Sequence, residues 1–509
     1  MKLKKTALAL ASALAMGALA IGCGSGDDAL VVDQGVVIKN ATIVNTADGS
    51  LTTGRTIVLA DGKIRTITGT AVTVAGSAQL VDASGQFVVP GYLDMHTHAM
   101  FAAEQSPAYW PLLIANGITG IREMSGSADI IKKARQLNLD SAAHKVDAPE
   151  ILAIPSDIFT GQQAGSAEAA AAFVDQKLAD GADFIKVVGG NREAVLSILK
   201  QAKAKGSYVA GHLVTAVSAQ ELTAAGWHAV EHLGASTGFL LDCSSQAAAL
   251  RAGMLSQPSA TSIVLTPQFL LNPLAFIGAA QAPLFQKIID TYDPEKCGAL
   301  AASFVAADTW HIPTMIRLRT QHFGNDTRYQ NNSNLIYVDK TRRALWQQTG
   351  ATFAAQGPAV SATLESFYGF EQKAVKMLDT AGVSMLTGSD LGGGWVVPGF
   401  ALHDEFHELA EAGLSPLRIL QMTTLNGAKF LRREASMGSV AEGKNADLVI
   451  LRGNPIADVN NLDNIATVVL KGKVFNAGDL QKMKDDVAAA YASMPAPPAS
   501  AALDMSHRH

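Results

Sequence analysis

The alternation of apolar and polar positions divides the chain into two β-rich ends around a long mixed middle. Residues 35–45 and 55–67 alternate or run β-branched, and Asp61-Gly62 is a typical hairpin turn within the second stretch. Residues 439–473 show the same pattern. The sequence therefore predicts one small β domain, a β-sandwich built from both chain ends.

The middle of the chain alternates strand-like and helix-like stretches. Helical patterns such as 167–180 and 216–226 separate short apolar runs. Repeated strand–helix units predict a parallel sheet, and eight of them fit an α/β fold of the (β/α)8 TIM-like barrel type, whose sites lie at the C-terminal ends of the strands. The expected strands are 87–100, 117–122, 151–155, 183–188, 207–212, 228–232, 311–315 and 383–388, with 262–267 competing for the seventh place.

These patterns give a division of the whole chain. The segments 240–310 and 316–380 are longer than simple connections, and such excursions usually shape specificity. The expected boundaries are 1–22 for a lipoprotein signal peptide, 23–34 for a tether, 35–86 and 436–477 for the two parts of the β domain, 87–435 for the metal-binding barrel, and 478–509 for a C-terminal helix or disordered tail.

The first residues have the pattern of a secretory signal. The basic stretch MKLKK precedes an apolar run of 17 residues, Thr6 to Gly22, which is shorter than a comfortable membrane span. Leu19 to Cys23 resembles the lipobox of bacterial lipoproteins, which implies cleavage before Cys23 and its acylation. We then expect a lipid-anchored protein at the membrane surface of the bacterial cell envelope. If Cys23 is not acylated, the protein would be secreted.

Composition narrows the choice of partners. The chain has 509 residues, 48% of them hydrophobic, and a net charge of −5 without a basic block or stripe. We therefore expect no nucleic-acid partner and a small-molecule substrate instead. In an oxidising envelope Cys243 and Cys297 could pair, or they could be two buried thiols. The sequence does not decide between a monomer and an oligomer.

Titratable side chains follow the ends of the expected strands. His96 and His98, two apart on an extended strand, can present both imidazoles to one point. Lys186 lies inside an apolar run, where a lysine either pairs with an acid or becomes neutral enough to form a carbamate. His212, His232 and Asp390 follow three further strands. The set of candidate metal ligands is His96, His98, Lys186, His212, His232 and Asp390.

These residues lie in motifs that resemble the metal-dependent amidohydrolase superfamily, in the branch of imidazolonepropionase-like and prolidase-like proteins. The resemblance runs from Val36 to about Phe475. Its pieces are VVPGYLDMHTH, GITGIREM, GADFIKVV, GHLVTA, AVEHL, LTGSD, LSPLRILQMTTLNGAKFL and GSVAEGKNADLVIL.

The resemblance implies a binuclear metal site. His96 and His98 would hold one cation with Asp390, His212 and His232 would hold the other, and a CO2-derived carbamate on Lys186 would bridge the two. Nitrogen and oxygen ligands without thiolate suit Zn²⁺, although Mn²⁺ or Fe²⁺ could serve. Two cations would activate water near neutral pH, and Asp390 would act as general base and then general acid.

The substrate is left open by the sequence. Some prolidase-like relatives have a Tyr two residues after the fifth strand's His, where this chain has Val214, so a small or cyclic amide is as plausible as a dipeptide. Arg122 could reach a substrate carboxylate or form a structural ion pair, and His403 could line the pocket. The alternatives to an amide hydrolase are a deaminase on the same fold and a non-catalytic lipoprotein that binds a small ligand.

Overall fold

The computed structural model describes residues 30–100, 108–256 and 266–495. The predicted signal peptide, Cys23, most of the tether and most of the competing strand 262–267 lie outside these ranges.

The strands are β1 Leu30–Val32, β2 Val36–Val44, β3 Leu51–Ala60, β4 Lys63–Thr68, β5 Val72–Val74, β6 Gln79–Asp82, β7 Phe87–Pro90, β8 Tyr92–Thr97, β9 Ile118–Glu123, β10 Glu150–Ala153, β11 Ile185–Val187, β12 Val209–Gly211, β13 Trp227–Glu231, β14 Trp310–Ile312, β15 Leu448–Leu451, β16 Ile465–Leu470 and β17 Lys473–Asn476.

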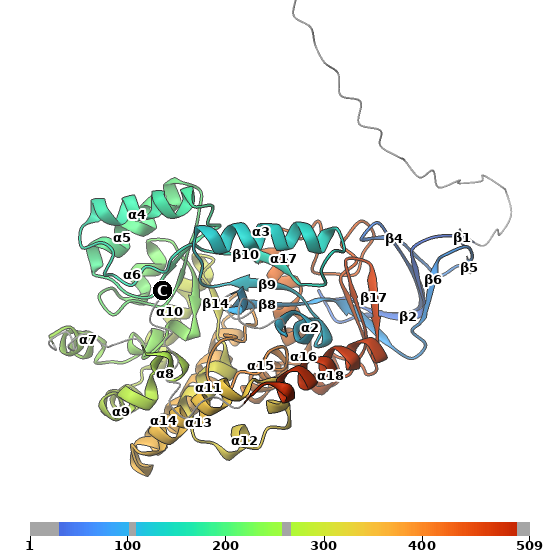
Figure 1. The fold of residues 1–509 in the computed structure, drawn as a ribbon. Coiled ribbons are helices and arrows are strands. Elements are labelled where there is room, and N and C mark those ends of the chain that lie inside the picture. The colour runs from blue at the N-terminus through green and yellow to red at the C-terminus, as the bar shows by residue number, and fades with distance from the viewer. Residues whose placement is uncertain (1–29, 101–107, 257–265, 496–509) are drawn as a thin grey trace, which may run out of the picture.

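The helices gather around and beside the central strands (Figure 1). The α-helices are α2 Tyr109–Ala115, α3 Ala128–Ala142, α4 Ala167–Ala179, α5 Arg192–Ala204, α6 Ala219–Ala224, α7 Ala247–Ser256, α8 Pro267–Leu271, α9 Leu274–Asp290, α10 Pro294–Ala306, α11 Met315–His322, α12 Thr327–Gln330, α13 Lys340–Ala354, α14 Pro358–Thr380, α15 Phe400–Glu411, α16 Pro416–Thr423, α17 Leu425–Phe430 and α18 Ala477–Ser493. Short 3-10 helices are η1 His232–Gly234, η2 Gly238–Leu241, η3 Ser333–Tyr337 and η4 Val459–Leu462.

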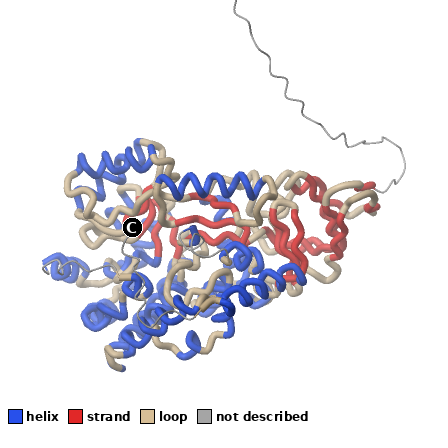
Figure 2. Tube along the Cα trace, viewed as in Figure 1, coloured by secondary structure: helices blue, strands red, loops and turns tan. Residues whose placement is uncertain are grey.

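The strands form two separate groups, which Figure 2 shows in the centre and at the right of the molecule. The peripheral group is an eight-stranded mixed sheet in the order β17-β16-β15-β7-β2-β3-β4, with β6 beside β2, and a parallel pair of β1 and β5. This sheet combines strands from both ends of the chain. The predicted turn at Asp61-Gly62 joins β3 to β4 as a hairpin.

The central group consists of parallel strands in the orders β10-β9-β8 and β11-β12-β13-β14. Further backbone hydrogen bonds connect these two sheets to each other and to the segment 383–388. Phe159 N donates to Lys186 O at 2.9 Å between β10 and β11, and Leu386 N donates to His311 O at 2.9 Å. Met95 N in turn donates to Thr387 O at 3.0 Å. The predicted eighth strand, 383–388, is thus an extended segment between β14 and β8 with one β-bridge at Met385, and not a regular strand.

The stretch 87–100, predicted as one strand, is divided between the two groups. Residues 87–90 pair with β15 and β2 in the mixed sheet, whereas β8 pairs with β9. The predicted domain boundary at residue 87 therefore separates β7 from the sheet to which it belongs.

Four helices beside the central strands begin at short polar side chains. Ser127, Ser166, Asn191 and Ser218 each accept a hydrogen bond from a backbone N–H in the first turn of α3, α4, α5 and α6. Such caps satisfy N–H groups that have no partner inside the helix and thereby fix where it starts. The caps thus define where the helices after β9, β10, β11 and β12 begin.

The excursions after β13 and β14 are mostly helical. The first contains the disulfide between Cys243 and Cys297, two positions for which the sequence left pairing open. It ties the segment after η2 to α10. Among the described residues, no helix combines the length and apolar character that crossing a bilayer requires.

Candidate metal centre

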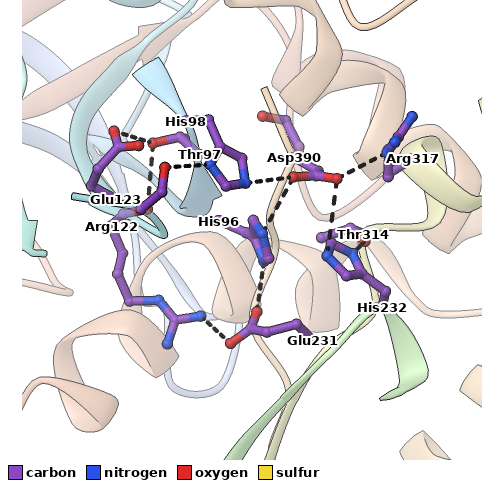
Figure 3. A network of polar contacts seen from close by, with 12 residues as sticks. His96, Thr97, His98, Arg122, Glu123, Glu231, His232, Thr314, Arg317 and Asp390 are labelled. Atoms are coloured by element: carbon purple, nitrogen blue, oxygen red, sulfur yellow. Dashed lines mark hydrogen bonds and ion pairs between the residues drawn. The ribbon is translucent and has the colours of Figure 1, made fainter. Parts of the chain in front are cut away.

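His96, His98 and Asp390 meet at the end of the central strands. His96 lies on β8, His98 follows it, and Asp390 follows the extended segment 383–388 with a φ of 51°. Asp390 Oδ1 lies 3.3 Å from the Nε2 atoms of both His96 and His98, as Figure 3 shows. One ligand atom from each residue can be chosen so that all three lie within 4.8 Å of one another. The sequence predicted this triad.

Gly388 permits the close approach of Asp390 to His96. A Cβ at this glycine would lie 2.7 Å from His96 Cβ, which is closer than carbon atoms pack. Asp390 N also donates to His96 O at 2.9 Å. The LTGSD motif therefore needs its glycine for packing against the strand that carries the two histidines.

Each of three histidines is oriented through Nδ1. His96 Nδ1 lies 2.7 Å from Glu231 Oε2, His98 Nδ1 lies 2.8 Å from Ser125 Oγ, and His232 Nδ1 lies 2.6 Å from Thr314 Oγ1. With Nδ1 engaged in this way, Nε2 is left to face the cluster. Partners at the remote nitrogen fix the tautomer and ring orientation of metal-binding histidines. The sequence analysis did not identify these partners.

His212 and His232 bring two further imidazoles to the cluster from the ends of β12 and β13. Their ring centroids are 5.2 Å apart, and His232 is 4.4 Å from His96. His232 Nε2 lies 3.9 Å from Asp390 Oδ2. Burial, followed by the charge of Lys186, lowers the pKa of His212 to about 3. Burial and the His96 charge also lower the pKa of His232, so both rings are neutral and able to bind a cation.

Lys186 lies on β11 and is buried, with 2% of its surface exposed. Burial lowers the pKa of its amine to about 8, against the opposing charges of Glu231 and Asp390. A larger fraction of the amine is therefore neutral near pH 7 than in an exposed lysine. The neutral amine is the form that can react with CO2.

Arg122, one of the two predicted substrate contacts, is buried and forms an ion pair within the protein. Its Nη2 lies 2.7 Å from Glu231 Oε1 and its Nε donates to Met95 O at 2.7 Å, with no exposed side-chain surface. Burial alone would raise the pKa of Glu231, but Arg122 and His96 hold it at about 2. Arg122 therefore keeps Glu231 ionised, and Glu231 in turn orients His96 (Figure 3).

His403, the other predicted substrate contact, has protein groups near both ring nitrogens. His403 is on α15, where its Nε2 lies 2.9 Å from Asn116 O and its Nδ1 lies 3.6 Å from Asp463. Its ring meets Tyr92 edge-on. The contact with Asn116 links α15 to the residue after α2, and the contact with Asp463 links α15 to the residue after η4.

Arg317 was missed by the sequence analysis. It lies on α11, and its Nε is 2.9 Å from Asp390 Oδ2, on the side of the carboxylate opposite His98 (Figure 3). It stands in the segment MIRLRTQH, whose mixed apolar and polar pattern gives no indication of a partner 73 positions further on.

The donor set fits divalent cations. His96 Nε2 is buried without a hydrogen-bond partner, although it faces Asp390. Imidazole nitrogens and a carboxylate oxygen are ligands that Zn²⁺ and neighbouring transition metals accept. Because a buried ring nitrogen that lacks a partner costs free energy, a bound cation would satisfy it.

The family comparison agrees with this chemistry. Residues 369–475, which include Asp390 and the return to β15 and β16, match the model of the Amidohydrolase family. An adenine deaminase from Listeria welshimeri is 35% identical over 86 residues, which are 17% of this chain and 14% of that protein. The matched stretch is thus a small part of the relative's length.

Solved structures share the fold over most of the chain. Bottromycin amidohydrolase matches with a TM-score of 0.68 and 20% identity, over 89% of this chain and 90% of that one. A Xaa-Pro dipeptidase crystallised with methionine in its active site matches with a TM-score of 0.59 and 18% identity, over 87% and 100% of the two chains. The chain therefore has the α/β fold of these amidohydrolase-type proteins.

Proposed function

We propose that the protein is a metal-dependent hydrolase that cleaves an amide-type C–N bond in a small molecule, a dipeptide or a cyclic amide. The convergence of His96, His98 and Asp390 within 4.8 Å is the observation that carries this proposal. The partial match to the Amidohydrolase family and the shared fold support it.

The proposed cofactors are two divalent cations, with Zn²⁺ best suited to the donors. His96, His98 and Asp390 would hold one, His212 and His232 the other, and a carbamate on Lys186 would bridge them. The carbamate forms when the neutral amine adds CO2 and releases one proton. Bound cations would supply a water with a pKa closer to neutrality and positive charge for the developing oxyanion.

The residues of the chain move the protons and hold the geometry. Burial raises the pKa of Asp390, but its contacts with the facing imidazoles of the cluster lower it well below the usual range, so the carboxylate is ionised. Its carboxylate accepts the proton of the attacking water and passes it to the leaving nitrogen. Glu231, Ser125 and Thr314 hold the imidazoles in place throughout, so little reorganisation is needed during the reaction.

We also infer that the central strands close into a (β/α)8 barrel. The hydrogen bonds from Phe159 to Lys186, and from Leu386 and Met95 across the segment 383–388, support this closure. The ligands then lie at one end of the barrel, where sites of such folds are found. For the peripheral strands we propose the sandwich arrangement that their sequence pattern predicts.

Deaminase chemistry is the second candidate, since a curated relative is an adenine deaminase. A deaminase would release ammonia and would need only one cation, whereas amide hydrolysis at a binuclear site would release an amine and an acid. The buried Lys186 favours amide hydrolysis at a two-metal site, because a site with one metal does not need a bridging carbamate.

A substrate screen tests the proposed activity. We expect Zn²⁺-loaded protein to hydrolyse at least one dipeptide, N-acyl amino acid or cyclic amide, with amine release followed by a ninhydrin-type assay. Adenine and related aminopurines form the second panel, with ammonia release as the readout. Turnover confined to the second panel would replace the hydrolase proposal by the deaminase.

We propose that the protein is anchored to the bacterial cell envelope through an acylated Cys23. Replacing Cys23 with Ser removes the thiol that carries the lipid, so the variant is expected to move from the membrane fraction to the soluble fraction. Cell fractionation followed by immunoblotting measures this. A variant that stays in the membrane fraction would contradict the anchor.

A further inference from the structure

The guanidinium of Arg317 is enclosed between Asp390 and α8. Its side chain is 5% exposed, and each of its three nitrogens has a partner. Nε donates to Asp390 Oδ2 at 2.9 Å, Nη1 to Leu271 O at 2.5 Å and Nη2 to Leu270 O at 2.8 Å. These contacts use three of the five guanidinium N–H donors. Because the side chain is almost wholly buried, we interpret Arg317 as a residue that holds other groups in place.

The two oxygens of Asp390 have different neighbours. Oδ1 faces the Nε2 atoms of His96 and His98, while Oδ2 receives the hydrogen bond from Arg317. Oδ2 also lies 3.9 Å from His232 Nε2, so both oxygens face imidazoles of the cluster and only Oδ2 is held by the guanidinium as well. A planar guanidinium in a fixed fork restrains the rotation of a carboxylate better than a flexible ammonium does.

The turn after Asp390 is packed against the same guanidinium. A Cβ at Gly393 would lie 2.8 Å from Arg317 Nη1 and 2.9 Å from its Cδ, so a side chain there would displace the arginine. Gly393 N also donates to Asp390 O at 3.1 Å. The position of Asp390 is therefore linked to Arg317 by a direct ion pair and by the packing of its own turn.

We propose that Arg317 is a positioning residue of the metal centre, which aligns Asp390 for cation binding and couples that alignment to α8. The inference rests on the proposed function. A positive charge so near the ligands would by itself disfavour cations, so the proposal requires that the alignment of Asp390 outweighs this repulsion. Loss of an orienting partner commonly weakens metal affinity by roughly 10–100-fold.

Titration of the metal-depleted full chain with Co²⁺, followed by its visible absorption, tests this inference. We expect Arg317→Met to weaken Co²⁺ affinity by about 10–100-fold and to alter the spectrum. Arg317→Lys keeps the positive charge but lacks the planar guanidinium, so its Co²⁺ affinity should lie between those of the wild type and Arg317→Met. Gly393→Ala should resemble Arg317→Met, because it displaces the same guanidinium, and it tests the proposal even if Arg317→Met fails to fold.

Arg319 offers a matched control on the same helix. It is buried and pairs with Glu408 at 3.0 Å and Asp326 at 3.6 Å, and none of the contacts described for it reaches the cluster. Arg319→Met should lower thermal stability while Co²⁺ affinity and spectrum stay as in wild type. Unchanged or tighter Co²⁺ binding by Arg317→Met, Arg317→Lys and Gly393→Ala would overturn the positioning role alone. Absence of Co²⁺ binding in wild type would overturn the proposed metal centre as well.

Discussion

Replacing Asp390 with Asn is expected to reduce hydrolysis by about 10²–10⁴-fold, the range that proton transfer by a positioned side chain contributes. Asn has nearly the same shape and can still accept the hydrogen bond from Arg317, but it cannot take up a proton and is a poorer cation ligand. Steady-state kinetics on whichever amide the substrate screen identifies would measure the loss, and circular dichroism would show that the fold persists.

A carboxylate just before β11, outside the set of candidate ligands, provides the control for this substitution. Asp183 forms a partly exposed ion pair with Arg135, and Asp183→Asn should leave turnover near the wild-type rate. If Asp390→Asn retained wild-type turnover of all substrates, Asp390 could not be the general base.

Replacing Arg122 with Met is expected to lower the free energy of unfolding by about 3–5 kcal/mol, because it leaves the Glu231 carboxylate buried without its main cationic partner. Neither member of this pair has exposed side-chain surface, so water cannot replace the lost contact. Chemical denaturation of the full chain would measure the change. His96 should also lose its orientation, since Glu231 would no longer be held in place.

Two further variants separate this effect from a general loss of charge. Arg135→Met removes a pair whose members are 42% and 35% exposed, and it should cost less than about 1 kcal/mol. The double variant of Arg122→Met with Glu231→Gln should recover part of the stability, because no buried charge remains unpaired. A cost for Arg122→Met as small as that for Arg135→Met would contradict the structural role assigned to this pair.

The sequence predicted the residues of the candidate metal centre better than the side chains that hold them in position. The two-residue spacing of His96 and His98 is a local feature of the sequence, and so are the strand-end positions of the other three residues, His212, His232 and Asp390. The pairs His96–Glu231 and Arg317–Asp390 join residues 135 and 73 positions apart, and no local pattern encodes such contacts. Sequence analysis therefore identified the side chains that meet in the cluster and missed most of the side chains that orient them.

The fold was predictable to a similar degree. Apolar runs located seven of the central strands because most of the residues in these strands are buried. The segment 383–388 reads as a strand too, yet it pairs through scattered hydrogen bonds and one bridge. Pro90-Gly91 marks a break within 87–100, but both halves have the same apolar character, and only tertiary pairing assigns them to different sheets.

Metal analysis of the purified full-length chain tests the central claim most directly, that the ligand cluster holds two cations. Elemental analysis against protein concentration should give about two equivalents of divalent transition metal per chain after loading in the presence of bicarbonate. The Lys186→Ala variant should bind less, because the bridging group is lost. One equivalent in the wild type would favour the deaminase, and no bound metal would contradict the account.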